Sequence, residues 1–191
     1  MFTQALLFLL DTLLGLFTLG VLLRFYLQLV AAPFHNPISQ AVVALTNFAV
    51  RPTRRVIPSL GGLDLSTLVL AYVAQLILQL ATLWLGGYPI LVATAAVYAA
   101  VGGLALLALV RLSVYIVLYA VLIQAILSWV NPHTPAAPVL DRLTEPVLGP
   151  LRRRFGVTGG FDLTPLFIFI AAQLLLMLVL TPIEMQLQHL L

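Results

Sequence analysis

Long apolar runs separated by short polar breaks dominate the hydrophobic pattern of this chain. A transmembrane helix needs about 20 consecutive apolar residues. Four runs approach or exceed this length: 3–30, 67–85, 112–130 and 164–181. Two shorter segments, near 38–48 and 139–147, carry apolar residues on one helical face and polar residues on another, as in helices that lie in the membrane interface. The pattern predicts an all-α transmembrane protein with about four spanning helices.

The apolar residues 90–110 leave an alternative open. Together with 112–130 they form a run that is too long for one straight span and barely long enough for two, interrupted only by Gly102-Gly103 and Arg111. They can make a third full crossing, a re-entrant hairpin or a helix on the surface. We expect an extra apolar segment that does not span the membrane.

Composition supports a membrane protein and narrows its partners. The chain has 191 residues, of which 62% are hydrophobic and 8% charged, and a soluble fold could not bury that much apolar surface. All nine basic residues are arginines that lie beside apolar segments, which favours anionic lipid headgroups over nucleic acid as the partner. No cysteine is present, so disulfides and thiolate chemistry are excluded. Because no basic region precedes the first apolar run, we expect that run to remain as an anchor.

One polar stretch occurs twice. Residues 51–66 and 149–164 align without a gap at a constant offset of 98 positions, so the chain contains two copies of one unit. The candidate lipid- or partner-binding residues are Arg51, Arg54, Arg55, Gly61, Gly62 and Asp64 in the first copy and Arg152, Arg153, Arg154, Gly159, Gly160 and Asp162 in the second. The arginines can grip lipid phosphates or an acidic partner loop. Alternatively, they only fix the topology, and the glycines only form a turn before helices that Ser66 and Thr164 cap.

The distribution of arginine predicts the topology. Both repeated stretches are basic, and positive loops stay on the cytoplasmic side. We therefore expect parallel repeats, four spans and both termini outside. Five spans with inverted repeats are the alternative.

The candidate functional residues inside the predicted spans are Asp11, Gln75, Gln79, Gln124 and Gln173. Gln75 and Gln173 are equivalent across the repeat. Such groups need partners in lipid, so they either line a polar path or form hydrogen bonds between helices. Asp11 can form a structural ion pair with Arg111 or serve a proton-linked function, and the ion pair is our expectation. Arg24 can extend to the interface.

The repeated pattern of Pro, two or three Arg, Gly-Gly, Asp and Ser/Thr resembles the YggT/YlmG family of small membrane proteins. Leu22-Leu23-Arg24 and Ser128-Trp129 are also similar to that family, whereas Gly156 stands where the first copy has Pro58. The resemblance implies two tandem repeats, 1–88 and 112–191, joined by an apolar segment, 89–111. Bacterial members are associated with osmotic stress and with envelope or division gene clusters. Plastid relatives are linked to haem attachment and nucleoid organisation.

No enzyme motif is present, so we expect neither catalysis nor a cofactor. His35 and His133 are equivalent across the repeat, but both lie in Pro-rich loops and are interpreted as turn residues rather than haem ligands. We expect a multi-pass protein of the inner (plasma) membrane, an assembly or organising factor that binds anionic lipids and a membrane protein partner through paired basic loops. The alternative is a small channel or transporter for ions or osmolytes that functions as a homo-oligomer.

Overall fold

The structure is a computed structural model that describes residues 1–59, 62–131, 133–155 and 162–191. Every element in these ranges is helical. In chain order they are α1 (Phe2–Leu29), α2 (Pro37–Val56), α3 (Leu65–Leu85), η1 (Ile90–Val92), α4 (Ala95–Val130), α5 (Ala137–Phe155), α6 (Thr164–Leu175), the π-helical turn η2 (Leu176–Leu180) and α7 (Thr181–Gln188).

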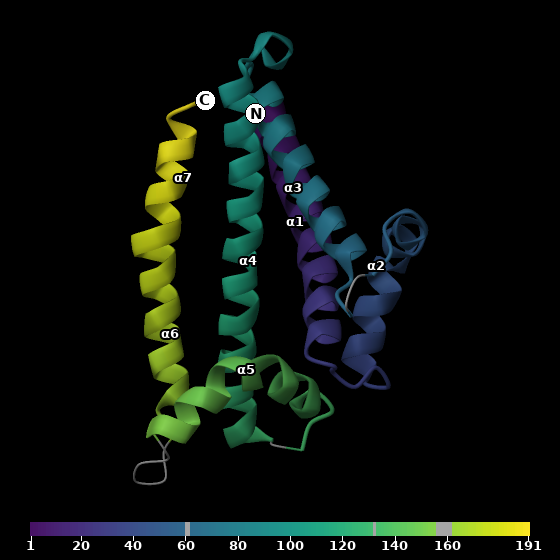
Figure 1. Cartoon of the computed structure of the whole chain (residues 1–191), viewed down its shortest axis with the longest axis vertical. Helices are drawn as coiled ribbons and strands as arrows, with labels where there is room; N and C mark the ends of the chain where they lie inside the picture. The colour runs from purple at the N-terminus through teal and green to yellow at the C-terminus, as the bar shows by residue number, and fades with distance from the viewer. Residues whose placement is uncertain (60–61, 132, 156–161) are drawn as a thin grey trace.

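Four helices are long and apolar enough to cross a membrane, which confirms the expected multi-pass protein. They are α1, α3, α4 and the continuous run from α6 through η2 to α7. α1 and α4 run away from the end at which both termini lie, and α3 and α6–α7 return to it (Figure 1). The two units are therefore parallel. The alternative of five spans with inverted repeats is not found in the described part of the chain.

The apolar residues before Leu112 are part of a longer helix. η1 ends at Val92, and from Ala95 the chain forms one helix of 36 residues, about 54 Å long. The expected separate segment is thus continuous with the third span from Ala95 onward, and α4 passes through the expected boundary at 111. The helix continues through the Gly102-Gly103 pair. These two glycines allow neighbouring helices to approach α4 closely. A Cβ at Gly102 would lie 3.2 Å from the Tyr72 hydroxyl, and one at Gly103 would lie 2.9 Å from Leu187.

The two amphipathic helices are present and are longer than expected. α2 begins after Asn36, whose side chain accepts a hydrogen bond from the Ile38 backbone N–H at 2.9 Å. Both helices continue through the repeated arginines, which lie in the last turns of α2 and α5 rather than in loops. The following spans also start slightly differently from the expectation: Asp64, not Ser66, occupies the N-cap of α3, and Thr164 is the first residue of α6.

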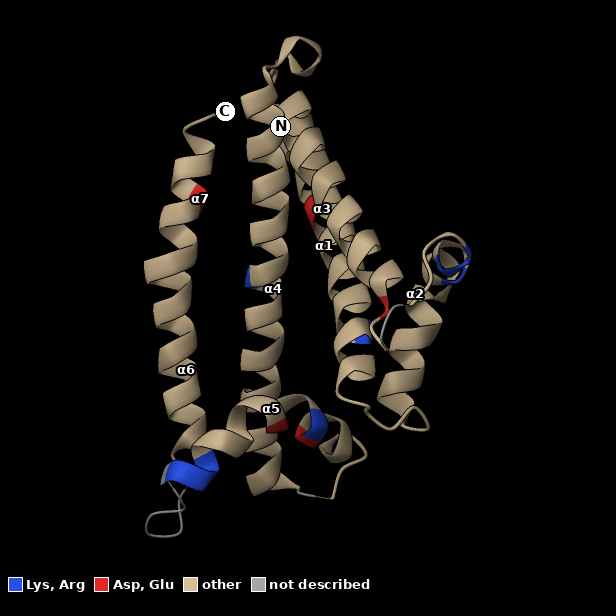
Figure 2. Ribbon diagram, in the orientation of Figure 1, with Lys and Arg blue, Asp and Glu red and all other residues tan. Residues whose placement is uncertain are grey.

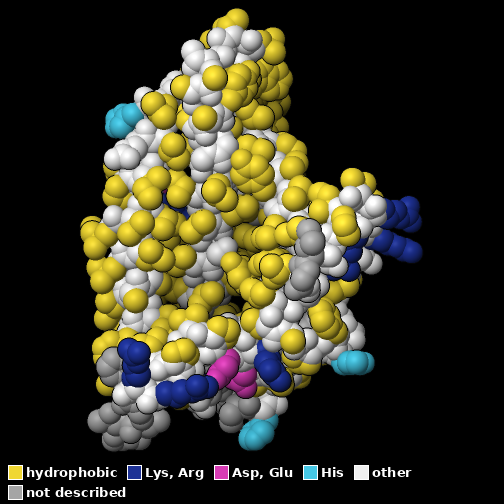
Figure 3. All heavy atoms as spheres, in the orientation of Figure 1, with side chains coloured by type: hydrophobic (Ala, Val, Ile, Leu, Met, Phe, Trp, Pro, Cys, Tyr) yellow, Lys and Arg dark blue, Asp and Glu magenta, His cyan; other side chains and the backbone are white. Residues whose placement is uncertain are grey.

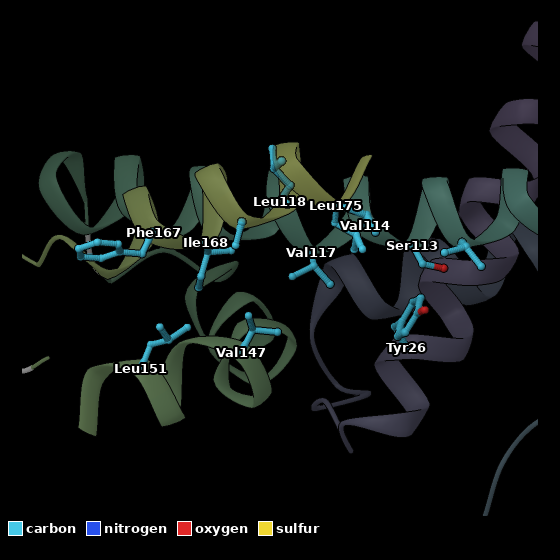
Figure 4. Close-up of a pocket in the computed structure, with 13 residues that line it drawn as sticks. Tyr26, Ser113, Val114, Val117, Leu118, Val147, Leu151, Phe167, Ile168 and Leu175 are labelled. Carbon is cyan, nitrogen blue, oxygen red and sulfur yellow. The ribbon is translucent and has the colours of Figure 1, made fainter. Parts of the chain in front are cut away.

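The spans are packed unequally. α1 lies along α3, and α4 packs on α3 through a cluster that includes Val21, Ala71 and Ile116. α5 crosses the lower part of α4 (Figure 1) and contacts α1 through a second cluster, which includes Leu27 and Val139. α6 is more separate, since an apolar cavity of about 500 Å³ lies between α4, α5 and α6. Figure 4 shows the side chains of these helices around it.

Candidate functional site: basic helix ends and an intramembrane cavity

An ion pair joins the end of α2 to the start of α3. Arg54 Nε donates to Asp64 Oδ2 at 3.0 Å, and its Nη2 contacts the same carboxylate and Gln28 Oε1, the latter at 3.2 Å. The Asp64 side chain is fully buried, whereas that of Arg54 is 42% exposed. Ser66 Oγ donates to the other carboxylate oxygen, and Thr67 Oγ1 donates to the Asp64 carbonyl at 2.6 Å. The carboxylate therefore organises the turn between the two helices.

The surroundings of Asp64 favour its charged form. Burial raises the pKa of its carboxyl, but hydrogen bonds from Arg54 and Ser66 and the positive charges of Arg54 and Arg24 outweigh burial. The pKa of Asp64 consequently lies below its usual value. The carboxylate stays ionised at neutral pH and compensates arginines that would otherwise lose hydration without a counter-charge.

The second unit reproduces this ion pair. Arg152 Nε donates to Asp162 Oδ2 at 2.8 Å, and the Thr164 backbone N–H donates to Oδ1 at 2.9 Å. Burial raises the pKa of Asp162, while hydrogen bonding by Thr164 and the pairing with Arg152 lower it to a net value below the usual one. Asp162 is less enclosed than Asp64, with a side chain 28% exposed. Two of the arginines expected to bind lipid or a partner are thus held in internal ion pairs.

The glycines of the repeated stretch are described at one position. Gly62 has φ of +84°, in the left-handed region that glycine adopts without the strain of a Cβ. This agrees with a turn immediately before α3. Gly61, Gly159 and Gly160 lie outside the described residues.

The other arginines of α2 and α5 are exposed. Within the described ranges they have no carboxylate partner; they are Arg51 and Arg55 on α2 and Arg142, Arg153 and Arg154 on α5. α2 and α5 both make the connection on the side away from the termini, but their basic ends are not adjacent. The end of α5 lies at the bottom of the bundle, and that of α2 lies higher along the long axis (Figure 2). Figure 3 shows basic side chains at the right edge and, well apart from them, others along the lower edge, where acidic side chains lie among them.

Arg24 does not extend to the interface as expected. It is only 6% exposed, and its Nη1 donates to Thr46 Oγ1 at 3.0 Å and to the Val43 carbonyl at 3.4 Å. Thr46 itself donates to the Val42 carbonyl at 2.7 Å. α2 covers this guanidinium, so Arg24 fastens α2 to α1 and contributes to the charge around Asp64.

The equivalent contact in the second unit uses an amide. Thr144 corresponds to Thr46 and donates to Gln124 Oε1 at 2.6 Å, while Gln124 Nε2 donates to Asp141. Gln124 therefore joins α4 to α5. Gln173 is exposed on α6 and lies apart from this contact.

A cavity of about 450 Å³, lined mostly by apolar side chains, lies among α1, α3, α4 and α7. Its polar lining consists of Asp11, Gln75, Gln79, Arg111, Tyr115 and Glu184. The expected pairing of Asp11 with Arg111 is wrong, since the Arg111 guanidinium pairs with Glu184 and joins α4 to α7. Gln75 Nε2 donates to Thr18 Oγ1 at 3.1 Å, which joins α3 to α1. The cavity thus brings together three of the five expected intramembrane residues, namely Asp11, Gln75 and Gln79.

The expected last span, 164–181, stops before Glu184. The helix continues instead through the π-helical turn Leu176–Leu180. Thr181 Oγ1 donates to the Leu176 carbonyl at 2.9 Å, and the same carbonyl accepts from the Thr181 backbone N–H, so the chain stays helical up to the residue before the proline. A glutamate two residues beyond a proline at the end of an apolar run is the signal that could have suggested a longer helix.

Known proteins match nearly the whole chain. A family model described as CCB3/YggT matches residues 3–85 and 103–183, one segment for each unit. The chain belongs to the CCB3/YggT family. An uncharacterized protein of Pseudomonas aeruginosa is 40% identical over 92% of this chain and 88% of its own length. One from Vibrio alginolyticus is 39% identical over 87% and 88%, and the uncharacterized protein YggT of Escherichia coli K12 is 32% identical over 84% and 81%.

Membership of the CCB3/YggT family confirms the resemblance and the tandem repeat. The second matched segment begins at residue 103, so it includes most of α4. No solved structure matches the chain significantly. The fold and the two sites described above consequently carry the functional argument.

Proposed function

We propose that this protein is a non-enzymatic organising factor that holds anionic phospholipids at the ends of α2 and α5. The observation that carries this proposal is the repeated ion pair. Arg54–Asp64 and Arg152–Asp162 fix both helix ends, while the neighbouring arginines remain exposed. Guanidinium groups at the interface of an amphipathic helix bind phosphate-bearing headgroups.

The apolar cavity above α5 supports a lipid as the occupant. Val147 and Leu151 of α5 face α4 and α6 across this cavity (Figure 4), and the next residues along α5 are the arginines 152–154. Its volume, about 500 Å³, lies in the range of sites that hold small ligands. An acyl chain between α4 and α6 would place its headgroup beside Arg153 and Arg154. The proposal places the site at the cytoplasmic face of the inner (plasma) membrane, where anionic lipids and a membrane protein partner meet it.

The two tryptophans provide a test with an internal control. Trp129 lies beside α5, in a pocket that Arg152 also lines, whereas Trp84 lies at the end of α3 near the termini. Trp84→Phe and Trp129→Phe each leave one reporter. In phosphatidylcholine bilayers, we expect brominated phosphatidylglycerol to quench Trp129 more strongly than brominated phosphatidylcholine does. The two brominated lipids should quench Trp84 to the same extent.

The matched variant is Arg153→Gln/Arg154→Gln, compared with Arg153→Lys/Arg154→Lys. Each basic residue near the surface contributes about 1 kcal/mol to the binding of an anionic lipid. The glutamine pair should therefore lower the association constant for phosphatidylglycerol, relative to that for phosphatidylcholine, about 30-fold. The lysine pair keeps the charge and should retain most of the preference. Equal quenching of Trp129 by the two lipids in the unmodified background would refute lipid binding and direct the search to an acidic protein partner.

Transport of ions or osmolytes is a second candidate function, and the observation that favours it is the group of polar side chains in the cavity among α1, α3, α4 and α7. The test is solute flux into liposomes that contain the protein, compared with Gln75→Leu. Flux that depends on Gln75 would support transport, whereas no flux above that of empty liposomes would refute it.

A further inference from the structure

An unpaired amide lies on the outer side of the last membrane span. Gln173 is in α6, about 14 Å along the helix from Thr164, in a run that is long and apolar enough to cross a membrane. The hydrocarbon core of a bilayer is about 30 Å thick, so this residue lies near its middle. The Gln173 side chain is exposed and has no hydrogen-bond partner in the part of the chain that the structure describes. Lipid chains offer none either, and an amide without a partner in hydrocarbon is costly.

The first unit satisfies the equivalent amide internally. Gln75 Nε2 donates to Thr18 Oγ1 at 3.1 Å, which joins α3 to α1. The residue equivalent to Thr18 in the second unit is Ile116, a hydrocarbon side chain that is buried in the cluster with Val21 and Ala71. The second unit therefore has the amide but not its internal partner.

The amide belongs to a face of α6 that points away from the bundle. The apolar cavity lies on another side of the helix, where the α6 residues that line it are Ile168, Ala171, Ala172 and Leu175. At about 3.6 residues per turn, Gln173 points about 100–160° away from them. The residues one or two turns from Gln173 on its own face are exposed and apolar; they are Leu166, Ile170 and Met177. Figure 1 shows α6 and α7 at one edge of the bundle, with the other helices on one side of them.

We infer that two copies of this chain associate through this outer face of α6, with their Gln173 amides hydrogen-bonded to each other. A carboxamide carries both donors and an acceptor, so two amides related by a two-fold axis along the membrane normal satisfy each other. Two copies with the same orientation in the membrane carry Gln173 at the same depth. A second copy thus supplies the partner that Ile116 cannot supply.

The neighbouring side chains fit the same contact. Leu166, Ile170 and Met177 of each copy would pack against those of the other, and hydrogen bonds between amides on neighbouring helices stabilise helix association in membranes. The inference is independent of lipid binding by α2 and α5, because Gln173 does not line the apolar cavity.

The first measurement is association of the full chain in phosphatidylcholine liposomes. The chain has no cysteine, so Leu91→Cys, in the loop near the termini, can carry either a donor or an acceptor dye. Energy transfer between the two labelled populations, measured while the protein is diluted with lipid, should follow a monomer–dimer equilibrium. Gln173→Leu should lower the association constant about 5- to 30-fold, the effect of losing about one hydrogen bond between membrane helices. Gln173→Asn, which keeps the amide, should retain most of the association.

The second measurement locates the contact with Gln173 left in place. Ile170→Cys and Met177→Cys each introduce one thiol about one turn from Gln173, and oxidation with copper phenanthroline should join two copies by a disulfide. Such a bond requires the two Cα atoms to lie within about 7 Å. Leu13→Cys is the control, because Leu13 is also exposed and lies within the α1 span. It should form little or no cross-linked product.

Three results would overturn the inference. The first is energy transfer no higher than that of randomly mixed monomers at every dilution, which would direct the search to a different membrane protein. The second is an association constant that Gln173→Leu leaves unchanged. The third is cross-linking of Leu13→Cys but not of Ile170→Cys or Met177→Cys, which would assign the contact to α1. If Gln173→Leu does not fold, the cross-linking result alone decides.

Discussion

The repeated ion pair allows one prediction in which each unit is the control for the other. Asp64→Asn and Asp162→Asn remove the same charge at equivalent positions. Asp64 is fully buried, while the Asp162 side chain is 28% exposed. Arg24, buried nearby, adds a second positive charge at Asp64 that has no counterpart at Asp162, because the equivalent residue is Leu122. We therefore expect the two substitutions to differ in cost.

The magnitude follows from burial. Asp64 accepts charge-assisted hydrogen bonds from Arg54 and Ser66, and loss of such bonds costs about 1.5–3 kcal/mol each. Asparagine keeps one acceptor oxygen, so we expect Asp64→Asn to lower the free energy of unfolding by about 3 kcal/mol. The pair at Asp162 is screened by solvent, and its loss should cost about 1 kcal/mol or less. For a chain of this size, these values correspond to decreases in Tm of about 6–12 °C and 2–4 °C.

The assay is thermal unfolding in detergent micelles, followed by circular dichroism of the helices. A double-mutant cycle with Arg54→Gln tests whether the loss comes from the Arg54–Asp64 contact. If it does, adding Arg54→Gln to Asp64→Asn should lower Tm little further. Equal decreases in Tm for the two aspartate variants would refute the reasoning. So would a larger decrease for Asp162→Asn.

Three further predictions concern pH, packing and the cavity ion pair. Folding lowers the pKa of Asp64, so its ionised carboxylate stabilises the folded state fully above the unfolded pKa of about 4. This contribution is lost as the pH falls from about 4 through the lower pKa of the folded state. Tm should therefore fall as the pH is lowered through this range, and it should fall less in Asp64→Asn. Gly103→Leu should displace α7 and cost about 1–3 kcal/mol, whereas Gly15→Leu, which enters open space, should change Tm little. Glu184→Gln should lower Tm by leaving Arg111 without its counter-ion, and Arg111→Gln in the same chain should restore part of the loss.

The pattern of apolar runs predicted the features of this fold that depend on length and periodicity. The number of spans, the two amphipathic helices and the tandem repeat follow from the sequence because lipid requires each span to satisfy its own backbone. Parallel repeats followed from the arginine bias. These properties depend on composition over many residues, so a single misjudged residue does not alter them.

Long-range partners could not be read in the same way. Gly102-Gly103 suggested a break, but the glycines serve close packing of α3 and α7 against α4. Arg24 resembled an interface residue, but α2 folds over it and supplies Thr46. Arg111 found Glu184 rather than Asp11 because the last helix continues beyond Pro182. In each case the deciding contact comes from a helix whose position the local pattern does not specify.

The repeat itself showed which residues are equivalent, but not what they do. Arg54 and Arg152 looked the same as their basic neighbours along the chain, and only the fold shows that both turn toward an aspartate. The repeat also concealed differences. Gln75 is buried against Thr18, while its equivalent Gln173 is exposed on the less closely packed α6.

Sidedness is the measurement that tests the account most directly, because lipid binding at both helix ends requires them to lie on one side. The chain has no cysteine, so single cysteines can be introduced and labelled with a membrane-impermeant maleimide. Ser59→Cys, after α2, and Glu145→Cys, on α5, should label only in permeabilised cells. Leu91→Cys, in the loop at the end that carries the termini, should label in intact cells (Figure 1). Labelling of Ser59→Cys and Glu145→Cys from opposite sides would contradict the parallel arrangement and the proposed function with it.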